Sequence, residues 1–103
     1  MNSMGIATLA NIANTSDSAF LRRGAIYALE ASGSREAISN LVALLDHQFP
    51  EKLTANWGWK GLPTSWQDEF QRQLTNTLTR ATKQDFGTNS AAWRAWLESE
   101  FKQ

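Results

Sequence analysis

Residues 20–46, FLRRGAIYALEASGSREAISNLVALLD, decide the fold, because they read as two amphipathic helices joined by a tight turn. Apolar residues recur in both halves at the spacing of one helix face, while Arg22, Arg23 and Glu30 mark the polar side of the first half. The pattern predicts burial of Leu21, Ala25, Ile26, Ala28 and Leu29 in the first helix and of Ile38, Leu41, Val42, Leu44 and Leu45 in the second.

The turn between the two helices is predicted from its small residues. Gly33 can take the left-handed conformation that ends a helix, and Ser34 can cap the start of the next one. Helices joined by so short a link are expected to lie antiparallel and to share their apolar faces.

This stretch resembles a known helical repeat. The run D-x-x-F-L-R-R-x-A-x-x-A-L-x-x-x-G-x-x-x-A-I-x-x-L-x-x-L-L-D, within residues 17–46, looks like a HEAT-like repeat of the short bacterial type, similar to the phycobilisome-lyase-like HEAT repeats. In that family an Asp precedes the second helix of a repeat and an Arg follows, and Asp17 with Arg22 or Arg23 would fill these places. The resemblance covers roughly residues 6–46 and implies a fold, with little to say about function.

The flanking segments extend the helical pattern. Residues 4–14 look like an opening helix, offset by 32 residues from the second central helix, and residues 47–63 look like an ordered inserted loop. A new helix is expected from the capping patterns at Thr64–Asp68, and a closing helix over about 89–101. Their apolar stripes are Trp66, Phe70, Leu74, Leu78 and Ala81, then Trp93, Trp96, Leu97 and Phe101.

We therefore expect an all-α fold, with one HEAT-like domain over residues 1–103. About five helices would form a short right-handed stack of antiparallel pairs, an α-solenoid. The closing helix would serve as a cap.

The amino-acid composition argues against some classes of binding partner. Ten Lys and Arg residues balance ten Asp and Glu residues, so the chain lacks the basic excess typical of nucleic-acid or anionic-membrane binding. No stretch approaches the about 20 apolar residues of a membrane span, and no basic residue precedes an apolar region at the start, which favours the cytoplasm. With no Cys, disulfides are excluded.

Trp57 and Trp59 are the most unusual residues, since they stand two apart in a glycine-flanked loop. Exposed, they could clamp a peptide, a base or a sugar. The alternative is that one or both fold back and fill the core. Lys60 beside them is either a charged partner-binding residue or a solvated loop residue.

The candidate partner-binding residues also include Arg22, Arg23 and Tyr27. The two arginines could form a basic patch, but one of them could instead make a structural ion pair with Asp17 or with a neighbouring repeat. His47, the only histidine, is interpreted as a helix-end cation stabilised by the helix dipole, because no set of metal ligands surrounds it.

No catalytic motif, cofactor-binding loop or metal-ligand cluster is present in the sequence. We therefore expect a non-catalytic protein–protein interaction or scaffold module without a cofactor, whose partner is another protein. A homo-oligomer formed through the N-terminal helix remains an option. The alternatives are an accessory subunit of a lyase-type enzyme, as the resemblance implies, or a helical-repeat nucleic-acid binder in which Trp57 and Trp59 stack on bases.

Overall fold

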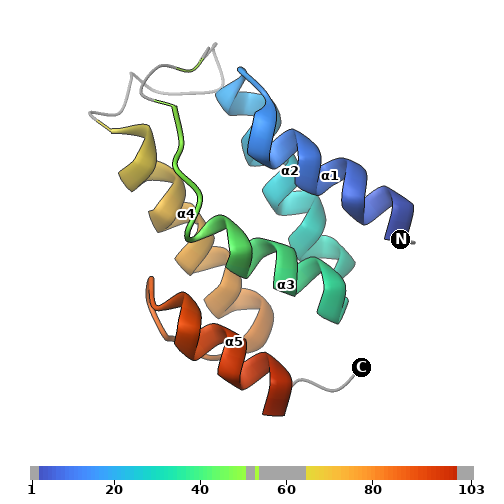
Figure 1. Cartoon of the computed structure of the whole chain (residues 1–103), viewed down its shortest axis with the longest axis vertical. Coiled ribbons are helices and arrows are strands. Elements are labelled where there is room, and N and C mark those ends of the chain that lie inside the picture. The colour runs from blue at the N-terminus through green and yellow to red at the C-terminus, as the bar shows by residue number, and fades with distance from the viewer. Residues whose placement is uncertain (1–2, 51–52, 54–64, 100–103) are drawn as a thin grey trace.

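The computed structural model describes residues 3–50, 53 and 65–99, and in this part of the chain all regular structure is helical (Figure 1). The five helices are α1 (Ser3–Thr15), α2 (Ala19–Ser32), α3 (Arg35–Leu44), α4 (Trp66–Thr82) and α5 (Ser90–Ser99). The expectations of an all-α fold and of about five helices are confirmed. None of these helices combines the length and the apolar character that crossing a membrane requires.

Short polar residues set the helix boundaries. Ser18, Ser34 and Ser65 are the N-caps of α2, α3 and α4, and each side chain accepts a hydrogen bond from the backbone N–H three residues further on. Gly33 ends α2 in the left-handed conformation with φ of 66°, as predicted, and Lys83 ends α4 in the same conformation.

Helix α3 is the centre of the packing, because it contacts all four other helices. Figure 1 shows it crossing the middle of the molecule, with α1 and α2 on one side and α4 and α5 on the other. Its side chains Ile38, Leu41, Val42 and Leu44 are at most 1% exposed. The predicted apolar face of this helix is confirmed.

The buried face of α2 differs from the predicted one. Leu21, expected in the core, is 54% exposed, while Arg22, assigned to the polar side, is only 2% exposed. The inward face instead contains Ala19, Arg22, Ala25, Ile26 and Leu29. Both registers fit a helical period, and the structure selects the one that lets Arg22 reach polar partners inside the fold.

The segment after α3 joins the core through Phe49. This ring stacks on Phe70 of α4, with centroids 4.9 Å apart. The Gln67 side chain fixes the same segment, since its Oε1 accepts from Phe49 N–H at 2.8 Å and its Nε2 donates to the His47 carbonyl at 3.0 Å. Of the predicted loop over residues 47–63, only 47–50 and 53 lie within the described residues.

The aromatic stripes of α4 and α5 follow the prediction where they are described. Trp66, Phe70 and Trp93 are at most 6% exposed. Trp96 is half-buried against the core, and Phe101 lies outside the described residues.

Candidate functional site

The predicted partner-binding residues separate into three groups. Arg23 and Tyr27 lie one helical turn apart on α2 and line the same groove. Arg22 is buried elsewhere. Trp57, Trp59 and Lys60 lie outside the described residues, so their alternatives stay as predicted.

Arg22 is held inside the fold by backbone carbonyls at the end of α1. Its Nη1 donates to the Ala13 carbonyl at 2.9 Å, and its Nε donates to the Ser16 carbonyl at 2.5 Å. Helix α1 has no basic residue in its last turn, so Arg22 supplies from α2 the positive charge that a helix C-terminus favours. The predicted structural role fits Arg22, but its hydrogen-bond partners are carbonyls, and Asp17 acts on its pKa only through the electric field.

His47 lies against this arginine and is not the helix-end cation that we expected. Arg22 Nη1 is 3.4 Å from His47 Nε2, and because a guanidinium can only donate, the imidazole nitrogen must accept. Burial and the charge of Arg22 lower the pKa of His47, against a hydrogen bond to the Asn14 backbone that raises it. Burial and the contact with Arg22 favour the neutral imidazole.

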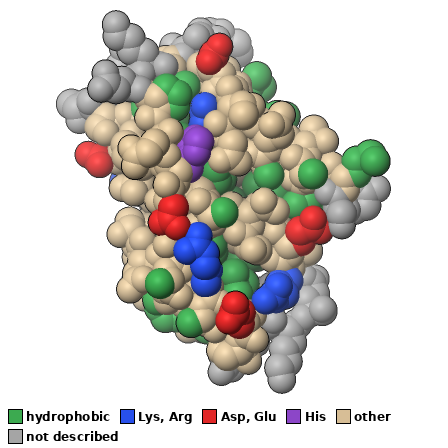
Figure 2. Space-filling view, in the orientation of Figure 1, with side chains coloured by type: hydrophobic (Ala, Val, Ile, Leu, Met, Phe, Trp, Pro, Cys, Tyr) green, Lys and Arg blue, Asp and Glu red, His purple; other side chains and the backbone are tan. Residues whose placement is uncertain are grey.

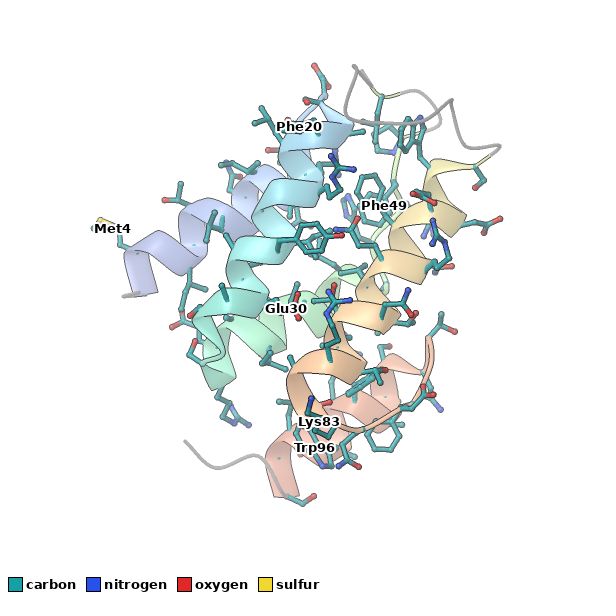
Figure 3. The ribbon with its side chains drawn as sticks, turned by 180° about the vertical axis from the view of Figure 1, so that it is seen from behind. Met4, Phe20, Glu30, Phe49, Lys83 and Trp96 are labelled. Carbon is teal, nitrogen blue, oxygen red and sulfur yellow. The ribbon has the colours of Figure 1, made fainter. Side chains whose placement is uncertain are left out.

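The candidate site is a polar groove between α2 and α4, on the face turned toward the viewer in Figure 3. Its volume is about 140 Å³. Its walls are formed by Arg23 and Tyr27 of α2 and by Glu69, Arg72, Gln73, Asn76 and Arg80 of α4. We call this set the α2–α4 groove.

Helical spacing explains why these side chains share one groove. On α4 the lining residues are Glu69 and the residues three, four, seven and eleven positions further on, so they form one polar face beside the buried stripe. Sequence reasoning placed Arg72 on the outside of this helix as an ion-pair partner of Asp68 and did not assign the α4 residues to a site. The same periodicity, applied to polar residues, would have indicated this face.

Two ion pairs shape the charge of the α2–α4 groove. Arg80 binds Glu30 through two parallel hydrogen bonds, from Nε and Nη2, at 2.9 and 2.8 Å, and this contact raises the pKa of Arg80. Figure 3 shows Glu30 on the side of α2 that faces α4. Arg72 pairs with Glu69 of its own helix, one turn away. This pair replaces the Asp68–Arg72 pair that spacing alone suggests.

Gln73 adds an unusual feature to the groove. Its Nε2 is buried and has no hydrogen-bond partner within the described part of the chain. A buried amide without an acceptor destabilises the fold by roughly 1–3 kcal/mol.

A second polar cluster joins α3 to α5. Asp46 accepts hydrogen bonds from Ser90 Oγ at 2.9 Å and from Arg94 Nη2 at 2.9 Å, and these bonds, Arg94 first, lower the pKa of its carboxyl. The serine donates to the carboxylate, so the cluster ties the end of α3 to α5. On the face shown in Figure 2, charged side chains of both signs alternate with isolated apolar ones.

No group of three or more His, Asp or Glu side chains suited to a metal ion occurs among the described residues. The chain matches no known family model, no curated protein and no solved structure.

Proposed function

We propose that this protein is a non-catalytic protein-interaction module that binds a partner protein through the α2–α4 groove. The observation that carries this proposal is the convergence of exposed Tyr27 with Arg23, Arg72 and Arg80 on one depression. Tyr and Arg are enriched among the residues that dominate protein–protein binding energies.

The size of the groove supports a macromolecular partner. Sites for drug-sized molecules and cofactors usually enclose about 300–1,000 Å³. A volume of about 140 Å³ is smaller than this range and suits one side chain of a partner. The rest of the contact would spread over the surfaces of α2 and α4.

The proposal includes a HEAT-like arrangement of the helices. The packing of α1 on α2, and of α3 on both, supports it, because helical repeats bury a shared core between successive helices. Such stacks bind partners through side chains on their outer surfaces.

The test is affinity capture from a lysate of the source organism, comparing wild type with Tyr27→Ser. Leu21→Ser is the matched control, because Leu21 is 54% exposed and Tyr27 is 47% exposed on the same helix, while Leu21 does not line the groove. Circular dichroism of each variant verifies folding before capture.

A specific partner that is retained by Leu21→Ser and lost by Tyr27→Ser supports the proposal. A partner that Tyr27→Ser still captures at wild-type level removes the groove as the binding surface. Failure of the wild type to capture any specific partner overturns the interaction function itself.

A further inference from the structure

The end of α1 is held by two side chains from other parts of the chain, Arg22 of α2 and His47 after α3. Arg22 donates to the carbonyls of Ala13 and Ser16. The His47 ring makes a hydrogen bond to the Asn14 backbone. The last turn of a helix leaves its carbonyls without helical partners, so these contacts satisfy groups that α1 itself cannot.

One nitrogen atom connects the two side chains. Nη1 of Arg22 is 2.9 Å from the Ala13 carbonyl oxygen and 3.4 Å from Nε2 of His47. This guanidinium nitrogen carries two N–H groups, so it can donate to both acceptors. The arrangement requires the neutral imidazole, because only an unprotonated Nε2 accepts a hydrogen bond.

Protonation of His47 reverses this contact. Nε2 becomes a donor that faces another donor, and the imidazolium adds a second positive charge beside Arg22. Burial of the ring and then the charge of Arg22 lower the pKa of His47, against the opposing effect of the Asn14 hydrogen bond. A state in which the ring has left this site therefore binds the proton more readily, and acid favours separation of the pair.

The groups around His47 leave an imidazolium without a carboxylate partner in the described part of the chain. Helix α1 carries no ionisable side chain. Asp17, between α1 and α2, acts on the guanidinium through the electric field. From α4, the uncharged Gln67 amide holds the His47 carbonyl. Asp46, next to His47 in the chain, is already bound to Arg94 of α5.

Helix α1 is the element that responds to loss of these contacts. Among the described helices it packs only on α2 and α3. Of its described side chains, those of Ile6 and Ala13 alone are buried, and Asn11 and Asn14 lower its helix propensity. Few buried side chains hold α1 in place, so the loss of polar contacts to its last turn affects this helix first.

We infer that Arg22 and His47 form a pH-sensitive switch, which holds the last turn of α1 when His47 is neutral and releases it when His47 is protonated. The other described helices stay packed, because α3 joins α2, α4 and α5 without α1. The switch goes beyond the proposed binding function and does not depend on it.

The experiment measures amide hydrogen exchange of the full, ¹⁵N-labelled chain over a series from about pH 7.5 to about pH 5, on both sides of the ordinary histidine pKa. Protection of the amides in the last turn of α1, corrected for the intrinsic exchange rate at each pH, is compared with protection in α3 and α5. The ring signals of His47 and the Nε–H signal of Arg22 are recorded at the same pH values.

Two variants complete the experiment. His47→Gln is the test variant, because an amide oxygen can accept a hydrogen bond from Arg22 at every pH. Asp46→Asn is the matched control, because it removes the titratable group next to His47 in the chain and leaves the contact with Arg22 in place.

We expect the protection of α1 to be lost with the same midpoint as the His47 ring signals, while α3 and α5 keep theirs. The Nε–H signal of Arg22 should shift or disappear over the same range, since its bond to the Ser16 carbonyl is released. His47→Gln should keep the protection of α1 throughout, and Asp46→Asn should respond as wild type does.

Protection of α1 that stays constant while the His47 ring titrates would overturn the inference. So would an equal loss in α1, α3 and α5, which would mean global unfolding. A wild-type response in His47→Gln, or its loss in Asp46→Asn, would assign the effect to a group other than His47. If His47→Gln does not fold, the wild-type midpoints decide: a midpoint for α1 that differs from that of the ring signals also overturns the inference.

Discussion

At the scale of single residues, Arg22 shows how a charged side chain becomes part of a core. A buried guanidinium is costly to desolvate, and burial lowers its pKa. The carbonyls of Ala13 and Ser16 offset this cost, since the end of α1 leaves such groups without helical partners. The ring of Phe49, with its centroid 5.5 Å from the guanidinium carbon, adds a cation–π contact.

Replacing Arg22 with Met should therefore destabilise the protein by about 3 kcal/mol, because two backbone carbonyls lose their donor. Urea unfolding followed by circular dichroism measures the change. Arg23→Met is the matched control, and as a change at the groove surface it should stay within about 0.5 kcal/mol. Equal losses in the two variants would mean that the buried bonds of Arg22 contribute no special stability.

The lowered pKa of His47 makes stability depend on pH. The unfolded chain has a histidine pKa of about 6.5, so below this pH the unfolded state binds more protons than the folded state. The contribution of neutral His47 is complete above about pH 6.5 and is lost as the pH falls below it. Burial of the ring and then the charge of Arg22 oppose protonation of His47, while the hydrogen bond to the Asn14 backbone favours protonation. Phe49 packs against the ring.

We expect the free energy of unfolding to fall between about pH 7.5 and about pH 5.5 in wild type. His47→Gln should show a smaller fall, because Gln does not titrate. Chemical denaturation at both pH values provides the comparison. The Asp46 carboxyl does not interfere, since its pKa is lowered from an already acidic value. Identical pH profiles for the two proteins would exclude His47 as the cause.

At the scale of helices, the ends of α2 and α3 and the buried face of α3 followed the sequence, but the buried face of α2 did not. Gly33 and Ser34 act within a few residues of chain, and their turn formed as expected. The face of α2 depends on partners distant in sequence, such as the His47–Phe49 segment, and local periodicity could not choose between Leu21 and Arg22 as the inward residue. For the same reason, the sequence predicted only part of the groove. Arg23 and Tyr27 were among the predicted binding residues, whereas the position of Gln73 in the groove depends on the packing of α4 on α2.

The ion pair between Glu30 and Arg80 links α2 to α4 beside the groove. Both side chains are solvent-accessible, so a double-mutant cycle with Glu30→Gln and Arg80→Gln should give a coupling of about 0.2–1 kcal/mol. The coupling should shrink in about 1 M salt, where charges are screened within a few ångströms. A coupling that does not change with salt would indicate that the pair acts through packing.

At the scale of the whole molecule, α3 makes the fold cooperative. The pairs α1–α2 and α2–α4 pack directly on each other, but α5 contacts the other described helices through α3. Loss of α3 packing should therefore detach α5 from the other described helices.

Leu41→Ala tests this role, because Leu41 is fully buried on α3 and its truncation leaves a cavity. We expect a loss of about 2–5 kcal/mol in the free energy of unfolding. Since α3 contacts every other helix, the folded indole N–H signal of Trp93 in NMR spectra should disappear in the same transition as helical circular dichroism. Ala43→Ser, at an exposed position of the same helix, should change stability little. Separate transitions for the two probes would mean that α5 unfolds independently and that α3 does not unite the molecule.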